Sequence, residues 1–193
     1  MVKTVLEYAS LAAEKLNKTP NPDWRHIAKN IPILKFPDGT TKENETYTGI
    51  TIKQTDVNLL SFPLKIVHKK EDILKDLEYY EPRLSPTGPA MGSAILSVLY
   101  TRLGKTEKAY QLFTNSYQPN ELPPFGVLAE TAGGSNPYFA TGAGGMLQAV
   151  LFGFGGLDIT EKGIFELDTK LPKNWKSLRF TGIGVEKKTI LKK

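Results

Sequence analysis

Three segments combine polar or charged side chains with more glycine and proline than a simple connection requires. They span residues 49–57, 79–89 and 123–138, and each is followed by an apolar stretch. Long loops in a compact domain are frequently functional, because a rigid body can present their side chains to a ligand. The residues that could do chemistry are therefore expected in these three loops.

The third loop contains a single acidic residue, Glu130, between Leu128-Ala129 and the pair Gly133-Gly134. A carboxylate in this setting can accept a proton from water as a general base, and the glycines let a substrate approach the backbone closely. The simpler interpretation is an acidic residue in a surface turn or at a helix N-terminus. Spacing alone favours that simpler interpretation.

The first loop places Lys53 and Gln54 just before Asp56. An adjacent cation and amide can hydrogen-bond sugar hydroxyls or a carboxylate. A solvated lysine beside a helix-capping aspartate is the more ordinary alternative. The dipeptide by itself is a weak signal and favours that alternative.

The second loop begins with Tyr79, Tyr80 and Glu81, which offer an aromatic platform next to an acid. Such a combination suits the apolar face of a sugar ring. Tyrosine pairs at helix ends also pack into the protein with their hydroxyl groups in water, which is the alternative here.

Composition excludes several classes of function. The chain has 193 residues, 40% of them hydrophobic, enough for a domain with a core, and its net charge of +5 comes from scattered lysines. We therefore expect no nucleic-acid partner. No apolar run approaches the roughly 20 residues of a membrane span, and no signal-peptide core follows Met1, so we expect no membrane association and leave the cellular location open.

Metal and cofactor chemistry is not expected either. The chain has no cysteine, and its two histidines, His26 and His68, lie in unrelated segments. The glycines at positions 142, 144 and 145 lack the preceding strand and the following Lys-Ser/Thr of a phosphate-binding loop, so close helix packing explains them better.

Hydrophobic periodicity predicts helices in most of the chain. We expect amphipathic helices over residues 3–18, about 22–30, 71–80 and 105–117, and more uniformly apolar, buried helices over 90–100 and 142–154. A small hairpin is expected near residues 33–41. After Gly155-Gly156 the pattern changes to short strands at 163–167, 178–180 and 185–190, separated by proline and glycine. The order indicates a mainly α body followed by a small C-terminal β-sheet module.

Four segments carry a resemblance to a known family. They read Ile-Lys-Gln-Thr-Asp-Val-Asn-Leu-Leu (52–60), Tyr-Tyr-Glu-Pro (79–82), Ala-Glu-Thr-Ala-Gly-Gly (129–134) and Phe-Ala-Thr-Gly-Ala-Gly-Gly-Met-Leu-Gln (139–148). Together they resemble the C-terminal part of glycoside hydrolase family 65. That family contains acid trehalases, the glucosidase acting on glucosylgalactosyl-hydroxylysine, and maltose, trehalose and kojibiose phosphorylases. The resemblance covers about residues 5–190.

The resemblance implies a fold and a set of site residues. It implies a partial (α/α)6 barrel, or toroid, over residues 1–156, and a small β module over residues 157–193. It also implies that Lys53 and Gln54 contact a glucose unit and that Glu130 is the general base of an inverting hydrolase of α-linked glucosides. Phosphorylases of the family carry phosphate ligands, including histidine, in the matching loops. Neither loop contains a histidine here.

One element of the family pattern is missing. Its general acid is a glutamate in a Gly-Pro-Asp-Glu-Tyr type motif, and the chain contains no such motif. We therefore expect part of a longer enzyme that carries half of an active site and is inactive alone. If the isolated chain did release glucose, Glu81 would be the first candidate for the acid.

Two other functions remain open at this stage. One is a non-catalytic carbohydrate- or partner-binding protein in which Tyr79, Tyr80 and Phe125 stack on a sugar. The other, less favoured, is a disaccharide phosphorylase. An incomplete toroid would also leave the helices at 90–100 and 142–154 exposed, so we expect association with the remainder of the enzyme or with itself.

Overall fold

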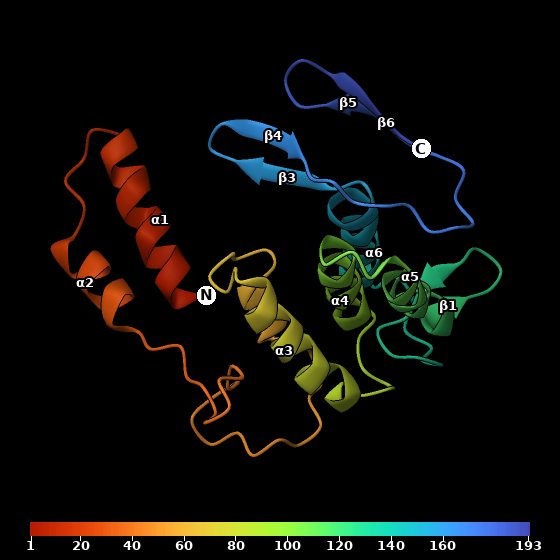
Figure 1. The fold of residues 1–193 in the computed structure, drawn as a ribbon, viewed down its shortest axis with the longest axis horizontal. Coiled ribbons are helices and arrows are strands. Elements are labelled where there is room, and N and C mark those ends of the chain that lie inside the picture. The colour runs from red at the N-terminus through yellow and green to blue at the C-terminus, as the bar shows by residue number, and fades with distance from the viewer.

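The structure is a computed structural model that describes residues 1–193, drawn in Figure 1. Its α-helices are α1 (Val2–Lys15), α2 (Pro22–Asn30), α3 (Lys70–Tyr80), α4 (Met91–Arg102), α5 (Thr106–Asn115) and α6 (Ala140–Gln148). Shorter helical segments are the 3₁₀ turns η1 (Asn58–Leu60), η2 (Glu81–Arg83) and η3 (Gln118–Asn120), and the π-helical η4 (Ala149–Phe154). The strands are β1 (Glu121–Leu122), β2 (Val127–Leu128), β3 (Leu157–Thr160), β4 (Gly163–Glu166), β5 (Leu178–Ile183) and β6 (Lys188–Lys192).

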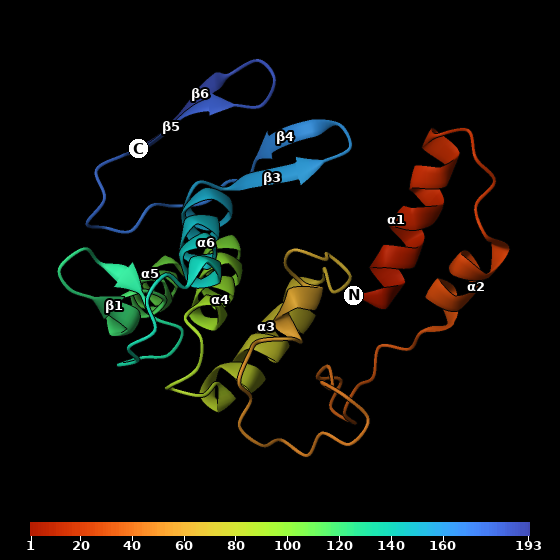
Figure 2. The same ribbon diagram turned by 180° about the vertical axis from the view of Figure 1, so that it is seen from behind.

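The first two helices form a hairpin that stands apart from the main body in both views (Figures 1 and 2). Asn17 adopts a left-handed φ of 54°, and the Lys18 amide then donates to the Ala13 carbonyl at 2.8 Å, which ends α1. The Asn21 side chain accepts from the Asp23 amide at 2.9 Å and caps α2. Both expected helices are confirmed, with α1 three residues shorter at its C-terminal end.

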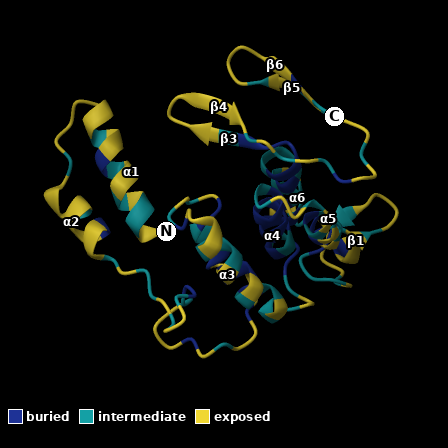
Figure 3. Cartoon of the chain, viewed as in Figure 1, coloured by how far each residue is buried: buried dark blue, intermediate teal, exposed yellow.

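Helix α4 is the centre of the body. Nine of its residues are buried, and it packs against α5, α6, η4 and η1. The main core cluster joins residues of α4 to Phe62, Leu77, Phe113 and Phe154. Figure 3 shows that α4 is mostly buried, in dark blue, whereas α1 is mostly exposed, in yellow.

This burial corrects one expectation. The helix predicted at 90–100 is not an exposed face, because its neighbours cover it within this chain. The large exposed apolar side chains lie instead mainly on α1 and in the C-terminal strands; on α1 they are Val2, Val5, Tyr8 and Leu11. Leu147 of α6, 55% exposed, is a smaller example.

Glycine in α6 permits a close helix contact. A Cβ atom on Gly145 would lie 3.2 Å from the Met91 Cβ and 3.3 Å from the Ala94 Cβ, both on α4. A Cβ atom on Gly144 would meet nothing within 4 Å. The interpretation of this segment as a packing motif is confirmed at Gly145. The continuation of α6 into a π-helix was not expected from the sequence.

The strands form three separate two-stranded antiparallel sheets, β1–β2, β3–β4 and β5–β6. The order of helices first and most strands last is confirmed. The predicted strand at 185–190 is displaced, since Lys187 has a left-handed φ of 49° in the turn and β6 begins at Lys188. Strands β1, β2 and β3 were not predicted. The structure has six α-helices, and their arrangement does not show the expected toroid. The division into a helical part, residues 1–156, and a β module, residues 157–193, stays a prediction.

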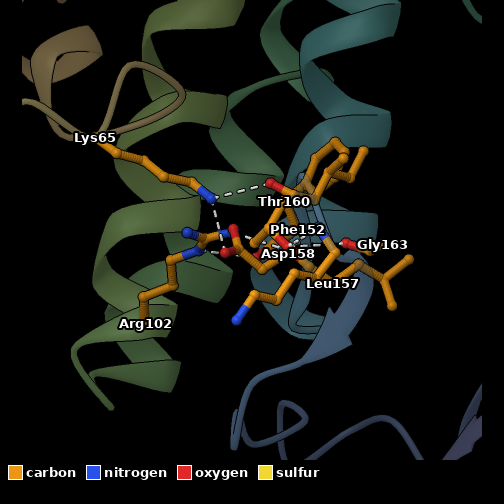
Figure 4. Close-up of polar contacts among 9 residues, drawn as sticks. Lys65, Arg102, Phe152, Leu157, Asp158, Thr160 and Gly163 are labelled. Atoms are coloured by element: carbon orange, nitrogen blue, oxygen red, sulfur yellow. Dashed lines mark hydrogen bonds and ion pairs between the residues drawn. The ribbon is translucent and has the colours of Figure 1, made fainter.

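A single arginine connects the helical body to β3 (Figure 4). Arg102, the last residue of α4, donates to the carbonyl oxygens of Phe152 at 3.2 Å and Leu157 at 3.1 Å, and to Asp158 Oδ1 at 3.3 Å. Lys65 Nζ approaches the other oxygen of Asp158 at 2.7 Å. The Arg102 guanidinium also lies 4.9 Å from the centre of the Phe62 ring. The Arg102 and Asp158 side chains are each 18% exposed, so water reaches this pair only partly, whereas Lys65 is 44% exposed.

No helix in the structure combines the length and apolar character that crossing a membrane requires.

The long segment between α2 and η1 is held against α3 by a buried carboxyl group. Asp76, 1% exposed, accepts a hydrogen bond from the Thr41 amide at 2.8 Å, and Tyr80 donates from its hydroxyl to the Thr41 carbonyl at 2.7 Å. The second oxygen of Asp76, Oδ2, and the Thr41 hydroxyl group are both buried without a hydrogen-bond partner. Burial raises the pKa of Asp76, and the Thr41 amide and Lys35 oppose this only partly.

The pair Gly144 and Gly145 provides a test of the packing. Gly145→Ala is expected to lower the free energy of unfolding by about 1–3 kcal/mol, because α4 must move away. Gly144→Ala is the matched control and should raise it by about 0.5–1 kcal/mol, because alanine favours a helix interior. Urea unfolding followed by circular dichroism measures both. Equal effects of the two substitutions would contradict the contact.

Asp76 predicts a dependence of stability on pH. Its native pKa lies above its unfolded value of about 3.9, so the folded state binds the proton more tightly. The protonated Asp76 carboxyl group therefore contributes fully to the stability of the folded state below the unfolded pKa. This contribution is lost as pH rises through the native pKa of Asp76. Asp76→Asn should therefore flatten the fall in melting temperature between pH 4 and pH 8, as measured by thermal denaturation. Parallel curves for the two proteins would refute this assignment.

Candidate active site

Three loops meet beside the N-terminal end of α4. Residue Ile52 forms a parallel bridge with Leu84, through hydrogen bonds of 2.9 Å from the Ile52 amide to the Arg83 carbonyl and from the Ser85 amide to the Ile52 carbonyl. Pro89 in turn forms an antiparallel bridge with Thr131. The second loop thus lies between the other two and connects them. The loops expected from composition to carry function are brought together by backbone contacts.

Glycine is required at one point of this junction. A Cβ atom on Gly88 would lie 2.9 Å from the Lys53 carbonyl oxygen and 3.2 Å from that of Ser85. Two backbone segments therefore approach each other more closely than any other residue type permits. This contact fixes the backbone that carries Lys53.

The junction places Lys53 next to Glu130. Lys53 Nζ lies 3.7 Å from Glu130 Oε1, and the side chains are 67% and 40% exposed. These residues are 77 positions apart in the sequence. The structure therefore brings together two of the three predicted site residues in a position open to a ligand.

Two asparagines contact the Glu130 segment. Buried Asn120 donates from Nδ2 to the carbonyl oxygens of Ala129 and Glu130, at 3.1 Å each. Exposed Asn136 accepts from the Glu130 amide at 3.3 Å and donates to Glu130 Oε2 at 3.5 Å. Neither was singled out from the sequence. The only local signal is their position beside the acidic loop, which by itself is typical of any turn asparagine.

Gln54 faces a different space from Glu130. It lines a hollow of about 340 Å³ whose other polar residues are Thr55, Asp56, Thr141 and Gln148 and whose walls come from η1, α4 and α6. Gln54 follows Lys53 directly in the sequence, so the hollow lies next to the segment that carries the Lys53–Glu130 pair, although neither Lys53 nor Glu130 lines it. Asp56 does not cap the next helix as expected, because η1 begins after Val57 and has no side-chain cap.

The proposed aromatic platform is wrong for one of its residues. Tyr80 is fully buried and its hydroxyl group is bonded inside the protein. The Tyr79 ring packs 5.4 Å from Phe36 and is covered at 3.8 Å by the Arg83 guanidinium. Phe125 remains 88% exposed. Of these aromatic residues, Phe125 is therefore the one with a free face for stacking.

Glu81 is engaged by the protein itself. The Tyr100 hydroxyl donates to Glu81 Oε2 at 2.6 Å, and Lys108 forms an ion pair with Oε1. Burial raises the pKa of Tyr100, and its bond to the Glu81 carboxylate adds to this effect. This arrangement attaches η2 to α4 and α5, which is a structural role for the carboxylate. No group of three or more potential ligands that could hold a metal ion is found.

Comparisons with known proteins show that the chain is similar to one part of several longer enzymes. It is 56% identical over 192 residues to kojibiose hydrolase of Mucilaginibacter mallensis and 50% identical over 188 residues to that of Flavobacterium johnsoniae. These alignments cover 99% and 96% of the chain but only 28% of each relative. An acid trehalase of Emericella nidulans is 34% identical over 184 residues. No protein-family model matches the sequence.

These findings confirm the expected resemblance. The chain is homologous to part of the glycoside hydrolases that include kojibiose hydrolase, acid trehalase and protein-glucosylgalactosylhydroxylysine glucosidase. Among those cited, its identity is higher to the two kojibiose hydrolases than to the trehalase. A solved structure of a proposed kojibiose phosphorylase from the human microbiome superposes with a TM-score of 0.67 over 93% of the chain, at 17% identity. That likeness concerns the fold alone.

Proposed function

We propose that the chain forms the general-base half of an inverting glycoside hydrolase that acts on α-linked glucosides. The observation that carries the proposal is the approach of Lys53 to Glu130 in a chain similar along its length to kojibiose hydrolases. The two residues come from distant loops, and both are open to a ligand. Kojibiose- and trehalose-like disaccharides are the substrates to test first.

In this mechanism Glu130 removes a proton from a water molecule, whose oxygen attacks the anomeric carbon. The glycosidic bond breaks on the opposite face of the sugar, and an acid protonates the departing oxygen. Lys53 and Gln54 hold the glucose unit by hydrogen bonds from their ammonium and amide groups. The half-exposed Glu130 carboxylate can receive both water and substrate.

The acid is proposed to come from polypeptide outside these 193 residues, since the relatives are several times longer. Inverting hydrolysis needs two carboxyl groups roughly 6.5–9.5 Å apart. Glu81, the other candidate, is held by Tyr100 and Lys108 and so is poorly placed to release a proton to a leaving group.

The competing functions are less well supported. A sugar-binding role without catalysis loses Tyr80 as a stacking residue, because that ring is buried. A phosphorylase would show glucose release that depends on phosphate. A hydrolase releases glucose in phosphate-free buffer.

The role of Glu130 predicts the behaviour of one substitution. In the complete enzyme, Glu130→Gln is expected to lower kcat about 10²–10⁴-fold for the preferred disaccharide, because the amide cannot accept the water proton. KM should change little. Glu121→Gln, at an exposed acid in β1, is the matched control and should leave turnover unchanged. Glucose release from kojibiose, trehalose and maltose is the measurement, and full activity of Glu130→Gln would remove this residue from the mechanism.

The remaining polypeptide is also proposed as the partner of the α1 surface. Val5 and Tyr8 of α1 are 62% and 65% exposed. The main packing partner of α1 is α2. Monomeric proteins seldom leave such residues clustered on one face. In a complete enzyme this face would be covered by neighbouring helices.

The isolated chain is therefore expected to self-associate and to bind a hydrophobic dye. Replacing Val5 and Tyr8 by lysine should reduce both effects without loss of helix content, because the two side chains are exposed. Size-exclusion chromatography and dye fluorescence provide the test. A compact monomer that binds no dye would contradict this surface assignment.

A further inference from the structure

The backbone on either side of Glu130 converges on one buried side chain, Asn120. Its amide nitrogen donates to two consecutive carbonyl oxygens, those of Ala129 and Glu130, at 3.1 Å each. The backbone carbonyl oxygen of Asn120 accepts from the Ala129 amide at 2.8 Å. Three hydrogen bonds therefore connect this residue to the segment that carries Glu130.

The far end of the same loop is attached to the same turn. The Gly133 amide donates to the carbonyl oxygen of Pro119, the neighbour of Asn120 in η3, at 3.0 Å. Both ends of the segment 129–133 are thus held by two adjacent residues. The loop cannot shift as a unit without breaking this set of bonds.

The chemistry of the position is specific to an amide. Asn120 is 3% exposed, its bond to the Ala129 carbonyl is buried, and its bond to the Glu130 carbonyl is partly buried. An NH₂ group can donate to both, whereas a carboxylate would repel both and an apolar side chain would leave both without this donor. Asparagine is the shortest side chain that supplies two such donors.

The Glu130 side chain is held less tightly than its backbone. Asn136 Nδ2 approaches Oε2 at 3.5 Å, whereas Lys53 approaches Oε1 at 3.7 Å. Each carboxylate oxygen therefore has one partner at long range, and the side chain stays 40% exposed. A fixed backbone combined with a lightly held carboxylate is what a base needs if it is to receive a water molecule in a defined place.

We propose that Asn120 is a positioning residue for Glu130 and that Asn136 orients the carboxylate. This inference rests on the proposed function, in which Glu130 is the general base. Asn120 touches neither substrate nor water in this role and acts through the backbone of Glu130. Misplacement of a reacting group by about 1 Å can cost roughly 10²-fold in rate, which sets the scale of the expected effect.

The central experiment compares Asn120→Asp with Asn174→Asp in the complete enzyme. The first substitution replaces the double donor by an acceptor, whereas the second makes the same chemical change at an exposed asparagine. We expect Asn120→Asp to lower kcat about 10²-fold with KM almost unchanged, and Asn174→Asp to have no effect. If Asn120→Asp lowers the melting temperature and leaves kcat intact, Asn120 is only structural and the proposal is wrong.

A milder variant covers the case in which Asn120→Asp fails to fold. Asn120→Ser removes both amide donors without placing a negative charge beside the two carbonyls, so kcat should fall by a smaller factor than in Asn120→Asp, with KM again unchanged. In the 193-residue chain, hydrogen exchange at the amides of Ala129 and Glu130 should become about tenfold faster in Asn120→Ser. The exchange rates of the α4 amides should stay the same. Unaltered exchange and unaltered kcat in this variant would overturn the proposal without any assumption about folding.

The role of Asn136 has its own readout. Asn136→Ala removes the N–H donor from the carboxylate at an exposed position, so kcat should fall while KM stays almost unchanged. Ser135→Ala, at the exposed neighbour, should leave both constants unchanged. An unaltered kcat in Asn136→Ala contradicts the orienting role.

The outcomes separate the two proposals. Full activity of Glu130→Gln would defeat the proposed function. An inactive Glu130→Gln together with fully active Asn120 and Asn136 variants would defeat the positioning inference alone.

Discussion

The burial of α4 on all sides is the constraint on which the remaining structure depends. An apolar helix cannot be left in water, and α5, α6, η4 and η1 cover it. Its two ends are fixed as a consequence. At its N-terminal end the chain enters from the loop that bridges Ile52 and Thr131, and at its C-terminal end Arg102 holds the strand that follows η4. The candidate site and the junction with β3 are thus positioned by one helix.

The site is assembled by its backbone and not by its charges. An exposed ion pair such as Lys53–Glu130 contributes at most about 1 kcal/mol, since water screens it and two long side chains must be ordered. The bridges at Ile52–Leu84 and Pro89–Thr131, the close contact at Gly88 and the bonds of Asn120 lie beneath that pair. The charged groups therefore remain free to exchange partners when a substrate enters, while the loops that carry them keep their places.

Sequence reasoning succeeded where one short stretch determines its own structure. The helix expected at about 22–30 and the apolar run expected at 90–100 each contain their own explanation. It failed where the answer depends on distant partners. Tyr80 resembles a surface aromatic until its hydroxyl group donates a hydrogen bond to the Thr41 carbonyl, and Asn120 resembles a turn residue until the Glu130 loop folds over it. Strand β3 was missed because its pairing with β4 decides the conformation of a four-residue segment.

The same distinction bears on the proposal that the chain carries one half of an active site. Every contact described around Glu130 comes from residues 52–136, and the helix that supports them is buried within this chain. A base needs only its own support and an open approach for water. In the proposed mechanism the acid lies on the opposite face of the sugar, roughly 6.5–9.5 Å from the base, so a different segment from the Glu130 loop must supply it. A chain that spans 28% of its relatives can therefore support the proposed base, Glu130, from its own residues without determining how the leaving group would be protonated.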